Sequence, residues 1–495
     1  MENKLQDLGD NEIKLSTPNG APFRFNITIT EGKTANSSNL TFEAALIDSK
    51  TGSIKIDSIY HLQNREHNSY LDLFDHLAKS FGCRVPRNRQ EPEKPKFTAT
   101  YKVLVEKNLS EEILYGYGDP AVLRIFEKVK GEEILWYYIV VTSNDAPNSF
   151  PIIRSKDLLN WNLAGFVFPE GKKPEWAAEG ESVGDYWAPE MHRVGSEFRV
   201  YFTAREKETR KLSIGIAKSS HPSGSFIAEK KPIKNNNVID PHVFVEDDNT
   251  TFLYWKEDNN DVFPWLLCQL LYEHPYLITE LFKEDKENQI TAALTATMFP
   301  WTQKLAPMER FFVLQTLIEA VISDFSTCKQ RLKYLADGTA NRSVKLKIFE
   351  LLQLMSTPVY AQQLSPDGSR LIGKPKKVIE NDQLWEAHLI EGTWVTKQQG
   401  KYYLFYSGND FSTTQYGIGV AIADSPLGPY KKMPEPLLRS TAEWSAPGHP
   451  SIATGPGGET HIFFHAYKPG QAGYKKFRAL LSALLVFEKD RVLLK

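Results

Sequence analysis

A hairpin pattern that recurs five times constrains the fold of this 495-residue chain more than any other feature. Each copy opens on a short turn residue, usually followed by proline, and continues as an apolar strand, a polar turn and a second, aromatic-rich strand. The five copies open at Asp119, Ala188, Asp240, Glu391 and His449. Similar hairpins at regular intervals predict a radial arrangement of sheets with about four short strands each. We therefore expect a mainly β chain built around a five-bladed β-propeller.

The N-terminal part lacks this repeat. Residues 1–20 are polar and are expected to be a flexible leader, and residues 21–106 to form a small α+β module. The module has alternating strand patterns and an amphipathic helix pattern over Tyr70–Phe81 that ends at a glycine. A proline-rich linker, Pro86–Pro95, then leads to a last strand over Phe97–Val105. No chemical motif is present here, so the module is interpreted as a packing or interaction appendage.

The remaining residues, 107–495, are assigned to the propeller, with one interruption. Residues 262–356 show apolar residues at helical spacing, and the strand pattern resumes at Thr357. This predicts a helical insertion between the second and third strands of blade three. The order of antiparallel strands places it on the face that carries Asp240, where it would either wall the site or serve as a solvated decoration or oligomer contact.

Composition excludes several classes of function. The formal net charge of −2 provides no basic field for nucleic acid or anionic lipid. Cys83, Cys268 and Cys328 are too few and too widely spaced for a disulfide framework, which favours reduced thiols. The polar start, Met1–Asp7, shows no signal peptide, and no apolar stretch reaches membrane-spanning length. A cytoplasmic protein without a membrane or nucleic-acid partner is expected.

Short motifs follow one another in a fixed order from residue 115 to the C-terminus. They are Asp119-Pro120, the Ser-Lys-Asp-Leu-x-x-Trp turn at 155–161, Trp-Ala-Pro-Glu at 187–190, Ile-Asp-Pro-x-x-Phe at 239–244, Gln-x-Leu-Ser-x-Asp-Gly at 362–368, Glu391-Gly392 and Pro-Gly-His at 447–449. In this order they resemble glycoside hydrolase family 43. The resemblance covers about residues 115–495 without the insertion. It implies a five-bladed propeller with a funnel-shaped site at its axis and no required cofactor.

The resemblance assigns three carboxylates. Inverting hydrolysis needs one carboxylate that activates water and one carboxylic acid that protonates the leaving oxygen, roughly 6.5–9.5 Å apart. By resemblance Asp119 is the general base, Glu391 the general acid, and Asp240 the third carboxylate, which raises the pKa of the acid through like charge. A turn-forming or strand-capping acid is the alternative for each. Glu386 rivals Glu391, because Thr393 stands where the family commonly has proline.

Five further residues are candidates for the substrate site. Trp187, Phe150 and Trp255 are possible sugar-facing aromatics, with packing inside the blades as the alternative. Arg205 could bind a hydroxyl group, pair with the third carboxylate, or lie at the surface. The resemblance places His449 in the central channel, near a structural calcium ion or a water cluster, and a hydrogen-bonded core histidine is the alternative. No His/Cys cluster has the spacing of a catalytic metal site.

These observations predict an inverting, exo-acting glycosidase that releases a terminal arabinofuranosyl or xylosyl unit from an oligosaccharide. A second hypothesis is a propeller that binds carbohydrate or protein and has lost turnover. A third is transfer of a glycosyl group to phosphate, which needs a cationic cluster that the sequence does not display. The sequence leaves open whether the chain forms a homo-oligomer.

Overall fold

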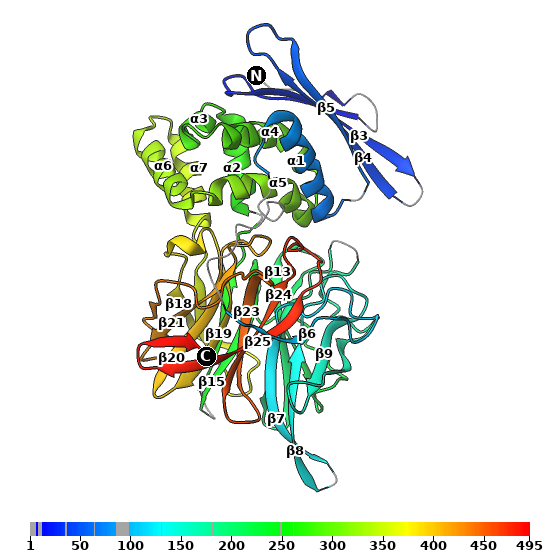
Figure 1. The fold of residues 1–495 in the computed structure, drawn as a ribbon, viewed down its shortest axis with the longest axis vertical. Helices are drawn as coiled ribbons and strands as arrows, with labels where there is room; N and C mark the ends of the chain where they lie inside the picture. The colour runs from blue at the N-terminus through cyan, green and yellow to red at the C-terminus, as the bar shows by residue number, and fades with distance from the viewer. Residues whose placement is uncertain are drawn as a thin grey trace. The chain divides into compact units, whose positions relative to one another are not determined.

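The computed structural model describes residues 6–7, 12–34, 37–63, 65–85, 99–129, 131–180, 183–247, 250–260 and 262–495. They form two compact units, each made from two separate stretches of chain (Figure 1). The first unit takes residues 1–90 and 259–356, and the second takes residues 91–258 and 357–495. The predicted linker Pro86–Pro95 lies entirely outside the described residues, as do most of residues 1–11.

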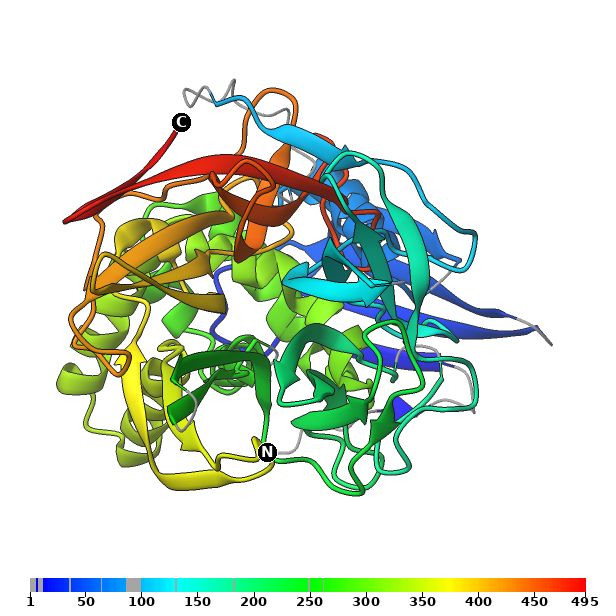
Figure 2. The same cartoon turned by 90° about the horizontal axis from the view of Figure 1, so that it is seen from below.

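The second unit is mainly β, and its described residues form five antiparallel sheets (Figure 2). The first sheet contains β7 (Ala121–Val129), β8 (Glu132–Val140), β9 (Ser149–Ser155) and β10 (Asn162–Phe168). The second contains β11 (Trp187–Val194), β12 (Glu197–Arg205), β13 (Leu212–Ser219) and β14 (Ile227–Ala228). The third contains β15 (Val238–Asp247), β16 (Thr250–Glu257), β17 (Val359–Leu364) and β18 (Leu371–Ile379). The fourth contains β19 (Ile390–Gln398), β20 (Lys401–Gly408), β21 (Gly417–Ala423) and β22 (Lys431–Lys432), and the fifth contains β23 (Ser445–Thr454), β24 (Thr460–Tyr467), β25 (Ala479–Glu488) and β26 (Arg491–Leu494).

The first strands of the five sheets contact one another in a closed cycle. β7 contacts β11, β11 contacts β15, β15 contacts β19, β19 contacts β23, and β23 contacts β7. Figure 2 shows these strands around a common centre. Residues at the beginnings of the first strands are therefore brought together although they are far apart in the sequence.

Position within a sheet explains which strands are apolar throughout. In β12, every residue after Glu197 is buried, because neighbouring sheets cover both of its faces. The outermost β18 is instead largely exposed and carries Lys374, Lys376 and Lys377. Charged side chains on an edge strand oppose pairing with another chain.

One strand belongs to a different unit from the one expected. The strand predicted at the end of the N-terminal module is β6 (Lys102–Val105), and it pairs antiparallel with β25 of the fifth sheet. Tyr101 and Val105 are buried in the core of the sheets. Alternation of apolar and polar residues predicted the strand but contains no information about its partner.

The first unit begins with a β-sheet. Its strands are β1 (Gln6–Asp7), β2 (Glu12–Ser16), β3 (Arg24–Thr34), β4 (Ser37–Ile47) and β5 (Ile54–Leu62), in that order. The expectation of a flexible leader over residues 1–20 is wrong for β2, which pairs with β3 and adds the buried Leu15 to the core. The predicted helix is α1 (His67–Phe81), and Gly82 ends it in the left-handed conformation with φ 69°.

Six further helices of this unit are described between β16 and β17, the second and third strands of the third sheet. They are α2 (Val262–Glu273), α3 (Leu277–Leu281), α4 (Lys286–Thr302), α5 (Pro307–Ile322), α6 (Phe325–Gly338) and α7 (Arg342–Leu354). α4 and α5 are buried on nearly all sides, so their apolar residues do not form a single stripe.

The N-terminal sheet and the inserted helices share one core. Helix α4 contacts β2 and β3, and α1 contacts α5. The ring of Phe42 lies 5.5 Å from that of Trp301 in an edge-to-face arrangement, and the Tyr70 hydroxyl donates a hydrogen bond of 2.7 Å to Glu309. The two segments expected from the sequence as separate additions thus form one compact unit.

The three cysteines are free and buried, and burial raises the pKa of the Cys83 thiol to about 12. In the part of the chain that the structure describes, no single helix is long and apolar enough to cross a membrane. Only α5 and α6 taken together, across a bend of 89°, meet the requirements of length and composition.

Candidate active site

Each first strand has a residue in the left-handed conformation just before it or within its first five residues. The φ angles are 53° at Asp119, 44° at Ala188, 57° at Asp240, 58° at Gly392 and 54° at His449. Proline follows every one of them except Gly392, which Thr393 follows. In the last four sheets the pairing register with the second strand shifts at this position, which is a β-bulge. Glu391 therefore stands one residue before the position that Asp119 and Asp240 occupy, and not at the equivalent position.

Hydrogen bonds between neighbouring sheets hold these strained residues. In four cases the backbone N–H donates to a side chain in or just after the second strand of the preceding sheet. These bonds join Ala188 to Thr142 Oγ1 (2.8 Å), Asp240 to Thr203 Oγ1 (3.2 Å), His449 to Ser407 Oγ (2.7 Å) and Asp119 to His465 Nδ1 (3.1 Å). The fifth N–H, that of Gly392, donates instead to Oδ2 of Asp240 at 2.8 Å. The backbone around the centre is thus fixed by side chains of adjacent sheets.

Asp119 is surrounded by cationic and hydrogen-bonding side chains. Its Oδ1 lies 2.8 Å from Nη1 of Arg478, and its Oδ2 accepts a hydrogen bond of 2.5 Å from the Thr142 hydroxyl. Nδ1 of His465 and of His449 lie 3.4 Å and 3.5 Å from Oδ1. Burial alone would raise the pKa of Asp119, but Arg478, the two histidines and the Thr142 hydroxyl together lower it well below its usual value. Asp119 is therefore ionised at neutral pH.

A glycine permits this ion pair. A Cβ atom on Gly118 would lie 1.8 Å from the guanidinium carbon of Arg478. Any side chain at this position would displace Arg478 from Asp119. Sequence resemblance identified the Asp-Pro motif but did not identify Gly118 or Arg478.

Glu391 and Asp240 lie in a different electrostatic environment. Oε1 of Glu391 accepts a hydrogen bond of 2.7 Å from the Tyr416 hydroxyl, and Oε2 lies 3.7 Å from Nζ of Lys256. Burial and, to a smaller extent, the negative charge of Asp240 raise the pKa of Glu391 to about 7, against the opposing effect of Lys256. Burial also raises the pKa of Asp240 to about 7, with Lys256 opposing and the charge of Asp119 adding to the rise.

The site therefore places an ionised carboxylate at Asp119 and, at Glu391 and Asp240, a pair of carboxyl groups of which one retains a proton near neutral pH. A site that moves the pKa values of carboxyl groups apart can use one as a base and another as an acid. Asp240 and Glu391 are also near enough to influence each other's ionisation. Like charges in one buried site favour the protonated form of one of them.

The rival residue Glu386 has a structural environment. It is fully buried, and Nζ of Lys432 lies 2.7 Å from its Oε1, which also accepts a hydrogen bond of 2.6 Å from Tyr406. Its Oε2 accepts the backbone N–H groups of Asp382 and Gln383. This environment accounts for both oxygens of Glu386 as parts of a local turn.

Three of the predicted substrate contacts have other roles. Phe150 is fully buried and packs against Phe168, Tyr186 and Phe202, and Trp255 is 2% exposed and stacks on Tyr360. Neither ring presents a face to a sugar. Arg205 does not pair with Asp240 in the structure; its Nε lies 2.5 Å from Oδ2 of the buried Asp185. Aromatic residues in these strands serve the packing between sheets, which the sequence could not separate from sugar binding.

Two other predicted residues remain candidates for contact with substrate. Trp187 is partly exposed, precedes the left-handed Ala188, and donates its indole N–H to Asn144. This is the position in the second sheet that Glu391 occupies in the fourth. His449 lies at the centre, beside Asp119.

Tyr416, Lys256, His465 and Arg478 also belong to the site, and the sequence did not reveal them as site residues. Lys256 and His465 occupy equivalent positions in the second strands, so a residue-by-residue alignment of the repeats would have found them. Tyr416 and Arg478 lie just before β21 and β25, outside the hairpin pattern. Their polar and charged side chains carry no signal that distinguishes them from surface residues.

The surroundings of His449 do not fit a calcium ion. Calcium prefers six to eight oxygen ligands, whereas the carboxylate beside His449 already binds the guanidinium of Arg478. Among the described residues, no group of three or more His, Cys, Asp or Glu side chains could hold a metal ion.

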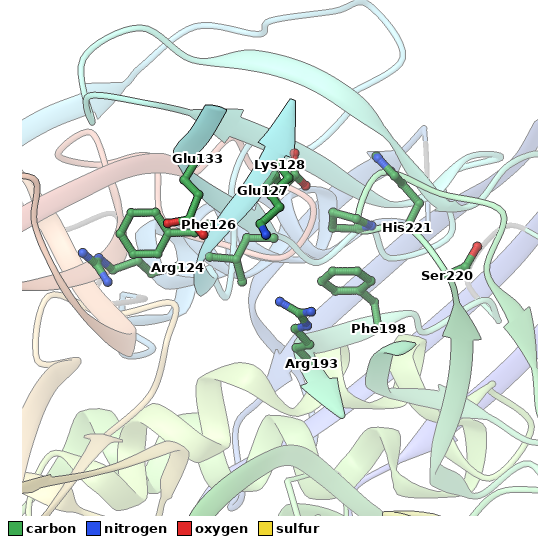
Figure 3. A pocket seen from close by; sticks show the side chains of 11 residues that line it. Arg124, Phe126, Glu127, Lys128, Glu133, Arg193, Phe198, Ser220 and His221 are labelled. Carbon is green, nitrogen blue, oxygen red and sulfur yellow. The ribbon is translucent and has the colours of Figure 1, made fainter. Parts of the chain in front are cut away.

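A cavity of about 830 Å³ lies between the first and second sheets (Figure 3). Its lining includes Arg124, Lys128, Arg193 and His221 and none of the residues predicted for the site. Lys128 and Arg193 lie at the ends of β7 and β11 that are far from Asp119 and Trp187. This cavity is therefore not the place where the three carboxylates would act.

Comparison with known families agrees with this arrangement. The family model for glycosyl hydrolases family 43 matches residues 117–295 and 352–492, which is more than half of the chain. The chain belongs to glycosyl hydrolase family 43. The matched region contains Asp119, Asp240 and Glu391.

Individual relatives match shorter stretches. The family 43 chain is 41% identical over 69 residues to xylosidase/arabinosidase 43A of Humicola insolens, covering 14% of this chain and 21% of that protein. It is 34% identical over 77 residues to β-D-galactofuranosidase xynD of Aspergillus niger, covering 15% and 23%. The matches thus span less than a quarter of these curated relatives. The crystal structure of a thermostable family-43 glycoside hydrolase superposes with a TM-score of 0.53 at 24% identity, over 80% of this chain and 96% of the other, which establishes a shared fold.

Proposed function

We propose that this family 43 protein is an inverting, exo-acting glycosidase that releases a terminal arabinofuranosyl or xylosyl unit from an oligosaccharide. Asp119 removes a proton from a water molecule as the water attacks the anomeric carbon. Glu391 donates its proton to the glycosidic oxygen that leaves. Asp240 favours the protonated form of Glu391 before the reaction.

The opposite ionisation of Asp119 and Glu391 is the observation that carries this proposal. A general base must be ionised and a general acid protonated at the same pH. Arg478 favours the ionised form of Asp119, and burial favours the protonated form of Glu391. An inverting reaction further requires roughly 6.5–9.5 Å between the two carboxyl groups, which leaves room for water.

We further propose that the five sheets are the blades of one β-propeller. The closed cycle of contacts between first strands supports this arrangement. The hydrogen bonds that join each left-handed residue to a neighbouring sheet also form a closed cycle. The last of these joins Asp119 in the first sheet to His465 in the fifth.

The choice of sugar rests on the names of the relatives. Xylosidase/arabinosidase 43A and a β-xylosidase of Xylanibacter ruminicola indicate pentosides, and the galactofuranosidase indicates that a furanoside ring is a substrate to test. Exo action would yield only monosaccharide from the earliest time points. Endo action would yield a range of oligosaccharides.

The first test is hydrolysis of chromogenic arabinofuranosides, xylosides and galactofuranosides by the wild type, Asp119→Asn and Glu391→Gln. Each substitution should lower kcat/KM by at least about 10²-fold, as expected for loss of a general acid or base. Glu386→Gln is the matched control and should retain kcat/KM in its folded fraction. Loss of activity in Glu386→Gln with retention in Glu391→Gln would refute the assignment of the acid.

Two further measurements test the mechanism. Proton NMR of the first product should show the anomer opposite to that of the substrate. Activity should be unchanged by a chelator, because the proposed chemistry uses no metal ion. Product with the anomeric configuration of the substrate would exclude the inverting mechanism.

The alternative function is carbohydrate binding without turnover. Thr393 in place of the family's usual proline after Glu391-Gly392 is the observation that favours it, since this bulge positions the acid. Binding of an oligosaccharide measured by calorimetry, with no hydrolysis of any substrate by the wild type, would support this alternative against the glycosidase.

A further inference from the structure

Lys256 breaks a regularity that the other four sheets obey. In each sheet, one residue in or just after the second strand lies opposite the residue that precedes the left-handed position. These residues are Thr142, Thr203, Lys256, Ser407 and His465. Four of them accept the backbone N–H of the next sheet's left-handed residue. A lysine ammonium has no acceptor, so Lys256 cannot make this bond.

In the fourth sheet, the backbone N–H that would bind the residue at position 256 has a different acceptor, which lies in the proposed catalytic site. The N–H of Gly392, which would correspond to the other four donors, binds Oδ2 of Asp240 at 2.8 Å. The third carboxylate therefore takes the place of a hydroxyl group. This contact ties the left-handed residue beside Glu391 to Asp240.

The ammonium group of Lys256 lies next to the proposed acid. Its Nζ is 3.7 Å from Oε2 of Glu391 and 3.9 Å from Oδ1 of Asp258, and the lysine side chain is 1% exposed. Tyr416 binds the other oxygen of Glu391. Glu391 is thus held between a hydroxyl group on one side and a buried positive charge on the other.

We propose that Lys256 is a positioning residue that holds the Glu391 carboxyl group. Because its side chain offers no acceptor to the Gly392 N–H, that N–H binds Asp240 instead. This inference rests on the proposed glycosidase function. It assigns to Lys256 a role in the catalytic step through Glu391 and Asp240, without contact between the lysine and the substrate.

The charge of Lys256 should affect how activity depends on pH. The groups that act on Glu391 are Lys256 in β16, Asp240 in β15, Tyr416 before β21 and His449 in β23. Of these, Lys256 is the strongest influence that favours the ionised carboxylate. Removing its charge raises the pKa of Glu391. Because the acid works in its protonated form, the alkaline limb of kcat/KM must then move to higher pH.

Three substitutions separate charge from structure. Lys256→Met keeps most of the side-chain length without charge, Lys256→Thr supplies the hydroxyl group present at this position in the first and second sheets, and Lys256→Arg keeps the charge. We expect the alkaline limb to move up by about one pH unit or more in Lys256→Met and Lys256→Thr, because an opposite charge within 4–6 Å typically shifts a pKa by about 1–3 units. Lys256→Arg should keep the wild-type limb.

The measurement is the pH profile of kcat/KM on a chromogenic pentoside, with circular dichroism as the check of folding. An unchanged limb in the Met and Thr variants, or an equal shift in the Arg variant, overturns the proposal. Two uncharged variants are used so that poor folding of one leaves the other to decide.

A second measurement does not depend on activity. The carboxyl resonance of Glu391, assigned with Glu391→Gln in ¹³C-labelled protein, should titrate at lower pH in the wild type than in Lys256→Met. If no variant or wild type hydrolyses any substrate, the glycosidase proposal fails, and this titration still decides the role of Lys256. Equal titration midpoints would exclude that role.

Discussion

Replacing Arg478 by methionine tests how the ionised state of Asp119 is maintained. The guanidinium Nη1 lies 2.8 Å from Oδ1 of Asp119, and the two side chains are 12% and 14% exposed. Methionine fills much of the same volume and removes the charge and the hydrogen bonds. Asp119 would keep the Thr142 hydroxyl and the two neighbouring histidines.

The magnitude follows from the burial of the pair. Removing one partner of a buried ion pair costs about 3–5 kcal/mol, because the other charge stays buried without compensation. Since Thr142 and two histidines remain beside Asp119, we expect a loss near the lower end, about 3 kcal/mol. The pKa of Asp119 should rise by about 1–3 units, since an opposite charge at this distance has been removed.

The sign of the pH dependence follows from the lowered pKa of Asp119 in the wild type. A carboxylate with a lowered pKa in the folded state stabilises the protein above its unfolded pKa, and this contribution is lost as the pH falls through the folded pKa. The difference in stability between the wild type and Arg478→Met should therefore be largest near neutral pH. It should narrow in acid, where protonation of Asp119 removes the unpaired charge.

The assay is denaturant unfolding followed by tryptophan fluorescence for the wild type, Arg478→Met, Asp119→Asn and the double variant. The double variant should lose less than the sum of the single losses by at least about 1 kcal/mol, because the two residues contact each other. In parallel, the acid limb of kcat/KM should move to higher pH in Arg478→Met. Additive losses, or a loss in Arg478→Met below about 0.5 kcal/mol, would refute the reasoning.

Three further predictions concern separate parts of the molecule. Tyr416→Phe removes the hydroxyl that favours the ionised form of Glu391. The alkaline limb of kcat/KM should therefore move up by about one pH unit, because a hydrogen bond to a charged group contributes about 1.5–3 kcal/mol. An unchanged limb would contradict this role of the hydroxyl. Glu386→Gln removes the buried carboxylate partner of Lys432, which then keeps only the exposed carboxylate of Asp382, and should lower the free energy of unfolding by about 3 kcal/mol, measured by denaturant titration. A loss of kcat with no loss of stability would be the contrary result. Phe42→Ala removes a ring that is 1% exposed and packs on Trp301, which should cost about 3–5 kcal/mol in the first unit; thermal unfolding with no change would show that the two segments do not share a core.

The mainly β class and the four-stranded sheets could be predicted because the signals are local. Alternating apolar residues form strands, and proline after a turn residue marks where each first strand begins, as at Asp119 and Asp240. The absence of this proline made Glu391 harder to assign, because the left-handed Gly392 is followed by Thr393. The structure shows that the left-handed conformation persists there through glycine, which adopts it without strain.

The errors at Phe150 and Trp255 have a common physical origin. Whether an aromatic ring in these strands faces the site or the neighbouring sheet depends on the bulge and on the packing between sheets, which a single sequence does not encode. Arg478 and Tyr416 were missed because they come from segments outside the repeat. Their roles depend on contacts with residues that are distant in the chain.

The origin of the first unit from two distant stretches affects how the protein can be made. On the ribosome, the first stretch of this unit, residues 1–90, is complete about 170 residues before its second stretch begins at residue 259. At about 5–20 residues per second, this interval is roughly 10–30 s. During that time Phe42, 1% exposed in the finished molecule, lacks the ring of Trp301 that later packs on it. Removal of residues 259–356 from an expression clone would make this exposure permanent, so an engineered minimal enzyme has to omit residues 1–90 as well.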